Sequence, residues 1–424
     1  MLLFFAFLIL AVYFFYLFAR SRTHNPLWLM LSAWSLGIGI PRLHLSPLEI
    51  ALPLKFRLLI LISLISFALG FFLFNKLWKK YPWWVKFSVL VRQGVSVRRL
   101  RYVIYLVFGL SLVGLYLFYK KAGNFPLLAP DSDAFRFAAD TEVPGLINYT
   151  AQFARLFIPL SFFVMFWEGF SFKKHWDLLL LSVLGTVSLT VFASRTQIFF
   201  IDLWVMALYL VIRKPTWRQA FKFYPFFLII SVVVLGAVPA VRNYKSYGTS
   251  NYLAGVTQID TTHYAKGSSY LVPIYVGVSF NMQALLHAQM YYETHPLQHG
   301  KVSLDPFTNL FGKALPILNK LKSQYDLGAI FYSWWNTGTY LFPFVQDFGE
   351  AAFFFAPFVI AGLIALAWRY WRSSPNYLSI NLYAYTCFFI VMTIYLSFTV
   401  RAEFYLDLAF LLLTHIYVST KQRT

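Results

Sequence analysis

Runs of about twenty apolar residues recur along the whole of this chain, the length that an α-helix needs to cross the hydrocarbon core of a bilayer. Only 12% of the residues are charged and 59% are hydrophobic, whereas an ordinary soluble domain carries about 25% charged residues. One soluble core could not bury this much apolar surface. The sequence therefore predicts an all-α polytopic membrane protein.

About eleven spans (10–12) are expected, with errors of a few residues at each end. They are drawn at residues 2–19, 27–41, 57–74, 102–119, 150–167, 177–193, 196–212, 223–241, 347–368, 379–399 and 402–419. Residues 1–18 have no basic start and no small-residue cleavage site, so we expect a first helix rather than a removed signal peptide. Residues 1–424 are expected to form a single transmembrane domain, with one large loop, residues 243–346, between spans eight and nine.

Basic residues favour the cytoplasmic side of a membrane and so predict the orientation. The segment 76–101 holds many basic residues and no acid: Lys76, Lys79, Lys80, Lys86, Arg92, Arg98, Arg99 and Arg101. Threading from this segment places further groups on the same side: Arg20 and Arg22, Lys173 and Lys174, residues 213–222, Arg369 and Arg372, and the C-terminal tail.

These cytoplasmic segments carry most of the net charge of +20, and their only acids are Glu168 and Asp177. The charge is thus explained by topology, and short scattered basic loops without base-reading elements argue against nucleic-acid binding. The loop 243–346 is expected on the opposite, non-cytoplasmic side.

Three arginines, Arg195, Arg242 and Arg401, interrupt apolar sequence on the non-cytoplasmic side. Arginine within a membrane helix costs about 2.5 to 3.5 kcal/mol. One such residue could extend to lipid headgroups, but three beneath a large loop favour a shared anion site. Because guanidinium binds phosphate oxygens bidentately, a lipid diphosphate is the expected ligand.

Any group transfer from such a diphosphate to a hydroxyl also needs a base near that hydroxyl. The candidates are three histidines of the loop and two acids at the membrane surface: His287, His295, His299, Asp347 and Glu403. Asp347 could instead cap the ninth span, and Glu403 could pair with Arg401.

Residues 270–300 are expected to form two short helices, broken near their glycine and proline positions, with Gln283, His287 and Tyr291 on one face. Asp131 and Asp133 form a DxD pattern, which in some glycosyltransferases binds a divalent cation. After Pro130 an ordinary turn is favoured, and neither a metal nor another cofactor is expected. The single cysteine, Cys387, is expected to pack inside a span.

In order and sidedness these motifs resemble the Wzy-type oligosaccharide repeat unit polymerases, over roughly residues 180–410. The resemblance rests on ASRTQ (193–197), on Arg242 closing a later span, on Tyr270, Pro273, Phe280 and Asn281 before PLQHG (296–300), and on NTGTYLFPFVQDFGE (336–350).

The resemblance implies a GT-C-like glycosyltransferase of the bacterial inner membrane, with its active site facing the periplasm and its C-terminus in the cytoplasm. Such an enzyme moves a growing O-antigen, capsule or exopolysaccharide chain from undecaprenyl diphosphate onto the non-reducing end of an incoming lipid-linked unit, without a metal. Related O-antigen ligases use arginines on the diphosphate together with a loop histidine. The match implies this diphosphate role first for Arg195, then for Arg242, and by position only for Arg401.

The implied partners are undecaprenyl-diphosphate-linked oligosaccharide and membrane lipids, with a flippase and a chain-length regulator as possible protein partners. Two alternatives remain open: an O-antigen ligase, which differs in its acceptor, and a flippase or transporter of lipid-linked oligosaccharide. A transporter is expected to carry polar residues along a mid-membrane path.

Overall fold

The computed structural model describes most of the chain, and helices dominate it. The described residues are 2–21, 23–80, 93–193, 195–216, 218–219, 225, 236–260, 268–311, 315–321, 323, 327–333, 335 and 337–421. They form two compact units, each described here by itself. Unit 1 comprises Met1–Val91, Tyr275–Pro375 and Phe389–Phe410, and unit 2 comprises Arg92–Ile274, Asn376–Phe388 and Leu411–Thr424. The single transmembrane domain expected over residues 1–424 stays a prediction.

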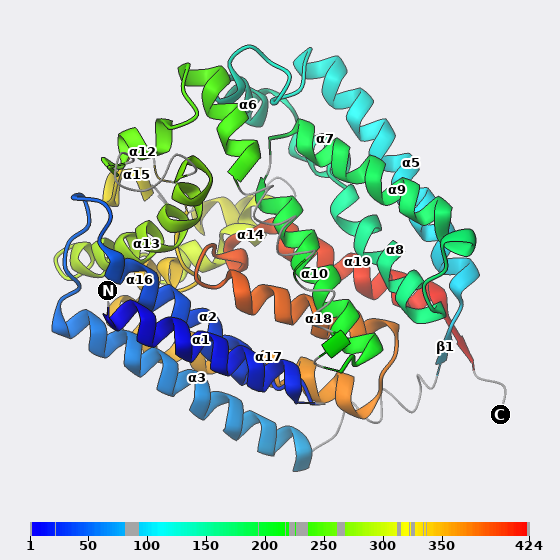
Figure 1. The fold of residues 1–424 in the computed structure, drawn as a ribbon, viewed down its shortest axis with the longest axis horizontal. Coiled ribbons are helices and arrows are strands. Elements are labelled where there is room, and N and C mark those ends of the chain that lie inside the picture. The colour runs from blue at the N-terminus through cyan, green and yellow to red at the C-terminus, as the bar shows by residue number, and fades with distance from the viewer. Residues whose placement is uncertain are drawn as a thin grey trace. The chain divides into compact units, whose positions relative to one another are not determined.

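Unit 1 is built around long apolar helices, with α3 packed along α17 and α1 packed against α2 (Figure 1). Gly70 allows the close approach of α3 to α17, because a Cβ atom there would lie 2.5 Å from the Phe358 carbonyl oxygen. The elements of this unit are α1 (Leu2–Arg20), α2 (Pro26–Gly39), η1 (Ile40–Leu43), α3 (Leu54–Lys80), most of α13 (Ser268–Tyr291), α14 (Lys301–Phe311), η2 (Pro316–Leu321), α15 (Leu327–Ile330), α16 (Phe342–Phe348), η3 (Gly349–Ala351), α17 (Ala352–Ser373) and η4 (Phe398–Val400).

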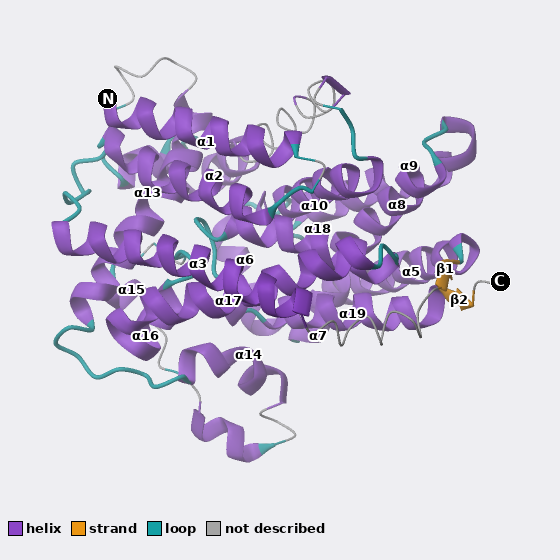
Figure 2. Cartoon of the chain, turned by 90° about the horizontal axis from the view of Figure 1, so that it is seen from below, coloured by secondary structure: helices purple, strands orange, loops and turns teal. Residues whose placement is uncertain are grey.

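Unit 2 is organised around α8, which packs against α5, α9 and α10 (Figure 2). Its elements are β1 (Gln93–Val95), α5 (Val97–Ala122), α6 (Ser132–Glu142), α7 (Gly145–Ala151), α8 (Ala154–Glu168), α9 (Phe172–Val191), α10 (Arg195–Arg213), the helical residues 236–247, α12 (Tyr252–Val256) and β2 (Ser419–Lys421). β1 and β2 pair in antiparallel register, with Gly94 opposite Thr420. Two further helices, α18 (Tyr377–Met392) and α19 (Ala402–Val418), contribute residues to both units.

Seven of the described helical segments are long and apolar enough to cross a membrane. They are Leu2–Arg20, Leu54–Lys80, Val97–Ala122, Gly145–Glu168, Thr196–Arg213, Leu271–Tyr291 and Phe342–Ser373. The chain is therefore an all-α protein of multi-pass membrane character. The count of eleven spans stays a prediction, and the eighth expected span, 223–241, lies mostly outside the described residues.

The expectation of two short helices over residues 270–300 is wrong. One continuous helix, α13, covers Ser268–Tyr291, with Pro273 inside it. Pro273 is the sixth residue of α13, so one intrahelical hydrogen bond is missing there and the helix continues nevertheless. Gly277 does not break the helix but serves packing, because a Cβ atom there would lie 2.6 Å from the Tyr395 ring.

The ninth expected span also begins differently. Asp347 lies in the short helix α16, and the long helix α17 starts five residues later, at Ala352. Gly349, with φ of +60°, stands at the change of direction between them. The loop expected over 243–346 contains one of the seven candidate spans, Leu271–Tyr291. The assignment of 243–346 as a loop therefore stays a prediction.

Candidate functional site

Arg242 lies in a cluster of charged side chains in unit 2, within the helical residues 236–247. Its Nε is 3.1 Å from Oδ1 of Asp133, and Nη2 of Arg136 is 3.9 Å from the same oxygen. The side chains of Arg242 and Asp133 are only 16% and 11% exposed, so their ion pair is largely shielded from water. Two guanidinium groups thus share one carboxylate. We call Asp133, Arg136 and Arg242 the Arg242 cluster.

The start of helix α6 positions the acid of this cluster. Asp131 is the N-cap of α6, where its carboxylate accepts a 3.0 Å hydrogen bond from the Ala134 backbone N–H. This bond, and a second one from Ser246, lower the pKa of Asp131. Asp133 follows in the first turn, where the helix dipole favours a negative charge.

The DxD pattern therefore begins a helix, in place of the ordinary turn expected there. Asp131 caps the helix, and Asp133 meets arginine. Within the described ranges, no three His, Cys, Asp or Glu side chains gather as a set of metal ligands.

The other two predicted diphosphate ligands stand in different settings. Arg195 is the first residue of α10 in unit 2, and its side chain, like Ser194, lies outside the described residues. Arg401 belongs to unit 1, directly follows η4 and is exposed. The three arginines are divided between the two units, so a site that they share stays a prediction.

In unit 1, one face of α13 holds the loop that joins η1 to α3. The Tyr275 hydroxyl accepts from the Leu45 backbone N–H (2.9 Å) and donates to the Glu49 carboxylate. Ser279 also donates to Glu49, and the Gln283 amide donates to the Ile50 carbonyl oxygen (2.9 Å). The spacing of four residues from Tyr275 to Ser279 to Gln283 places all three on one side of α13. The predicted face of Gln283, His287 and Tyr291 is the continuation of this stripe.

Glu49 is a buried carboxylate at the centre of that contact, with only 9% of the residue exposed. Burial raises its pKa, and hydrogen bonds from Tyr275 and Ser46 offset part of this rise. A carboxyl group with a raised pKa keeps its proton to a higher pH than an ordinary carboxyl group, a property that candidate acid–base residues share. Glu49 is therefore an acid–base candidate in addition to the five predicted ones.

The three predicted histidines have different surroundings. The His287 ring is partly buried on α13 and packs against Phe331, with 4.9 Å between ring centroids. His295 is exposed and stacks on Tyr291, with its Nδ1 2.9 Å from the Tyr291 carbonyl oxygen. His299 is exposed and adopts a positive φ of +50°. His295 thus has local contacts with Tyr291, and the catalytic role predicted for each of the three histidines stays untested.

Asp347 is fully buried and caps a helix, but not the one expected. Its Oδ1 accepts from the Val302 N–H (3.0 Å), and its Oδ2 accepts from the Ser303 N–H (2.7 Å) and the Ser303 hydroxyl (2.6 Å). These residues form the first turn of α14, which has Gly300 before it and so no side-chain cap of its own. A carboxylate that satisfies two helix N–H groups has a structural role.

Glu403 lies in the first turn of α19, two residues after Arg401. Both residues are described, and no ion pair joins them, so the expected Arg401–Glu403 pair is not formed. The first turn of a helix favours a negative charge, which accounts for an acid at this position. Its catalytic role stays a prediction.

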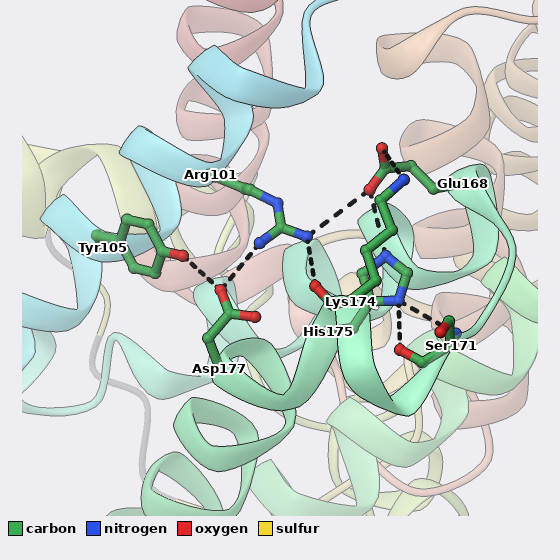
Figure 3. A network of polar contacts seen from close by, with 7 residues as sticks. All are labelled: Arg101, Tyr105, Glu168, Ser171, Lys174, His175 and Asp177. Carbon is green, nitrogen blue, oxygen red and sulfur yellow. Dashed lines mark hydrogen bonds and ion pairs between the residues drawn. The ribbon is translucent and has the colours of Figure 1, made fainter.

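The two acids of the expected cytoplasmic side are partners of basic residues in unit 2. Arg101 of α5 lies between Asp177 (2.9 Å) and Glu168 (3.7 Å), as Figure 3 shows. Glu168 also accepts from Lys174 (2.8 Å) and contacts the buried His175 (3.2 Å). This network ties together α5, α8 and α9 and accounts for both acids by structure.

Sequence reasoning missed Glu49 and Arg155. Glu49 is the only acidic residue in the first 130 positions. This isolation in the sequence could have identified it as a candidate. Arg155 of α8 is 5% exposed, and its guanidinium lies 4.5 Å from the centre of the Tyr149 ring. It stands in the fifth apolar run, so the criterion that selected Arg195, Arg242 and Arg401 also selects it.

Comparison of the chain with protein-family models, with curated proteins and with solved structures gives no match.

Proposed function

We propose that the protein is a membrane-embedded glycosyltransferase of the oligosaccharide polymerase type. It transfers a growing glycan from undecaprenyl diphosphate to the non-reducing end of an incoming lipid-linked repeat unit, on the periplasmic face of the bacterial inner membrane. The observation that carries this proposal is the Arg242 cluster, in which two arginines share one largely buried aspartate.

The cluster has the charge that a diphosphate needs. Asp133 neutralises one of the two guanidinium groups, so an anion that displaces its carboxylate can bind both Arg242 and Arg136. Arginine binds phosphate oxygens through two parallel N–H groups, and such bonds are stronger where water is excluded. A diphosphate carries more than one negative charge and therefore competes well with a single carboxylate.

In the proposed reaction, a hydroxyl oxygen of the acceptor sugar forms a bond to the anomeric carbon of the donor glycan. The bond from that carbon to the diphosphate oxygen breaks, and undecaprenyl diphosphate leaves with the bonding electrons. Fixed arginines stabilise the charge that develops on the leaving oxygen. A base accepts the hydroxyl proton. Glu49 joins His287, His295, His299 and Glu403 as a candidate for this role, while the carboxylate of Asp347 caps α14.

The test is elongation by purified protein in liposomes, with a lipid-linked repeat unit and no added metal. We expect a ladder of longer lipid-linked glycans. Arg242→Ala should reduce elongation by about 10²-fold or more, because it removes a group that stabilises the transition state. Arg195→Ala should do the same, while Arg98→Ala, at an exposed residue of the expected cytoplasmic side, should keep the ladder.

Two aspartates at the same helix start provide a matched pair of variants. Asp133→Asn removes the competing carboxylate and should lower KM for the lipid-linked unit several-fold, whereas Asp131→Asn keeps a good N-cap and should leave KM unchanged. Transfer of glycan only to a different acceptor would indicate the ligase alternative. Transport without new glycosidic bonds would indicate a flippase, and full elongation by both arginine variants would reject the proposed diphosphate site.

A further inference from the structure

The segment from η1 to the first turn of α3 carries three cations, of which only one has carboxylate partners. Lys55 lies between Glu293 (2.6 Å) and Glu350 (2.5 Å). Arg42 and Arg57 form no ion pair with any acid in the described part of the chain. Unit 1 therefore presents two cations here whose charge is offset by no carboxylate of the described residues.

The two arginines are also close enough to affect each other. Burial, and then the positive charge of Arg57, lower the pKa of Arg42. The Arg42 Nε is buried and has no hydrogen-bond partner among the described residues. Arg57 is held in place because its Nε donates to the Leu52 carbonyl oxygen at 2.7 Å.

This arrangement is electrostatically unfavourable as it stands. Arg57 occupies the first turn of α3, where the helix dipole disfavours a positive charge. A neighbouring guanidinium adds repulsion, and a buried N–H without a partner adds a desolvation cost. An anion between the two arginines would relieve the two unfavourable charge interactions, the one with the helix dipole and the one between the guanidinium groups.

An apolar stripe begins at Arg57 and continues along α3. Leu61, Ile65, Leu69 and Leu73 follow it at intervals of four residues and are 51%, 50%, 55% and 48% exposed. The stripe from Leu61 to Leu73 is about 18 Å long at 1.5 Å per residue. One leaflet of a bilayer has a hydrocarbon thickness of about 15 Å, half of the usual 30 Å.

We propose that Arg42 and Arg57 bind the phosphate of an anionic phospholipid whose acyl chain lies along this stripe. The phosphodiester of a phospholipid offers oxygens that can accept hydrogen bonds from the paired N–H groups of two guanidinium groups. The acyl chain of the same lipid matches the length of the stripe. A free phosphate would leave the stripe unused, and an undecaprenyl chain is much longer than one leaflet. The proposal is independent of the glycosyltransferase function.

The experiment is native mass spectrometry of the full chain in detergent, titrated with dioleoyl phosphatidylglycerol or with dioleoyl phosphatidylcholine. We expect phosphatidylglycerol to be retained preferentially. Arg42→Gln and Arg57→Gln should each lower its retention about tenfold, the effect of losing a charge-assisted hydrogen bond. Lys301→Gln, which removes an exposed charge from the same unit, should retain as much lipid as the parent chain.

Arg57→Lys keeps the positive charge but lacks the paired N–H donors of a guanidinium group. It should retain an intermediate amount of phosphatidylglycerol, which separates lipid binding from misfolding. Three results would each overturn the proposal: equal retention of phosphatidylcholine, loss of phosphatidylglycerol to excess inorganic phosphate, or undiminished retention by the Arg42→Gln/Arg57→Gln double variant. Preferential retention of undecaprenyl diphosphate over phosphatidylglycerol would assign the arginines to the carrier lipid instead.

Discussion

At the scale of single residues, Glu49 and Asp347, both buried carboxylates of unit 1, differ in their hydrogen-bond donors. Asp347 accepts from two backbone N–H groups, which can only donate, so protonating it would break the cap of α14. Glu49 accepts from one backbone N–H, that of Ser46 on Oε2, and from the hydroxyls of Tyr275 and Ser279, which can donate or accept. A proton on Oε1 of Glu49 would leave the Ser46 bond in place and turn Ser279 from donor to acceptor, whereas a proton on either oxygen of Asp347 would cost a backbone bond of the α14 cap.

The raised pKa of Glu49 makes stability depend on pH. Because its pKa is higher in the folded state than the ordinary 4.5, the stabilisation it provides is complete below about pH 4.5 and is lost as pH rises through the folded pKa. Each pKa unit corresponds to about 1.4 kcal/mol. Glu49→Gln cannot ionise, so its melting temperature should rise relative to the parent chain as pH increases from 4.5 toward neutrality.

Thermal unfolding followed by tryptophan fluorescence over this pH range measures the difference. Tyr275→Phe removes a hydrogen bond that lowers the pKa of Glu49, so it should move the pH window upward. Parallel melting curves for the parent chain and Glu49→Gln at every pH would show that the burial of Glu49 does not perturb its ionisation.

The sequence allowed part of this site to be predicted at the residue scale. Arg242 was selected because a charge in an apolar run is costly, but its partner Asp133 stands over a hundred positions earlier, and no local pattern joins them. The same limit applies to Asp347, which caps a helix that begins 46 positions before it in the chain. Local patterns predict residue types and faces, whereas pairs depend on how the helices pack.

At the scale of elements, the length of the apolar runs predicted the long helices well. It predicted less well where one helix ends and the next begins. The glycine and proline of α13 indicated two helices, yet Gly277 is present because the Tyr395 ring packs against it. A glycine in an apolar helix therefore has two explanations, a break or a close contact. Only the tertiary neighbours distinguish them.

This distinction predicts opposite effects for two helical glycines. A Cβ atom at Gly70 of α3 would lie 2.5 Å from the Phe358 carbonyl oxygen, whereas one at Gly109 of α5 would meet nothing within 4 Å. Gly70→Ala should destabilise the protein by about 2 kcal/mol through the forced separation of helices. Gly109→Ala should be neutral or stabilising by up to about 1 kcal/mol.

Cys387 reports both changes, because it is buried and the described part of the chain has no other thiol. A thiol-reactive dye in a thermal scan should label Gly70→Ala at lower temperature than the parent chain, and Gly109→Ala at the same or higher temperature. Equal labelling curves for the two variants would contradict a packing role for Gly70.

At the scale of the whole molecule, the side of the membrane occupied by α13 decides how the chain is threaded. The loop between η1 and α3 accompanies α13, with Leu45 at Tyr275, Glu49 at Ser279 and Lys55 at Glu293. This loop is irregular and has exposed positions, and irregular backbone exposed to hydrocarbon is not tolerated. The contacts therefore support a position for α13 at the expected non-cytoplasmic end of α3, opposite the Lys79 end.

We therefore expect residues on both sides of α13 to face the same compartment. In a Cys387→Ala background, Gly248→Cys and Lys301→Cys should both react with a membrane-impermeant maleimide added to spheroplasts, because the whole segment 243–346 is expected on the periplasmic side. Lys79→Cys should react only after permeabilisation, since Lys79 belongs to the basic segment expected in the cytoplasm. Labelling of Gly248→Cys but not Lys301→Cys would instead make α13 a true span, invert everything after it, and move Arg401 and Glu403 to the opposite face from Arg242.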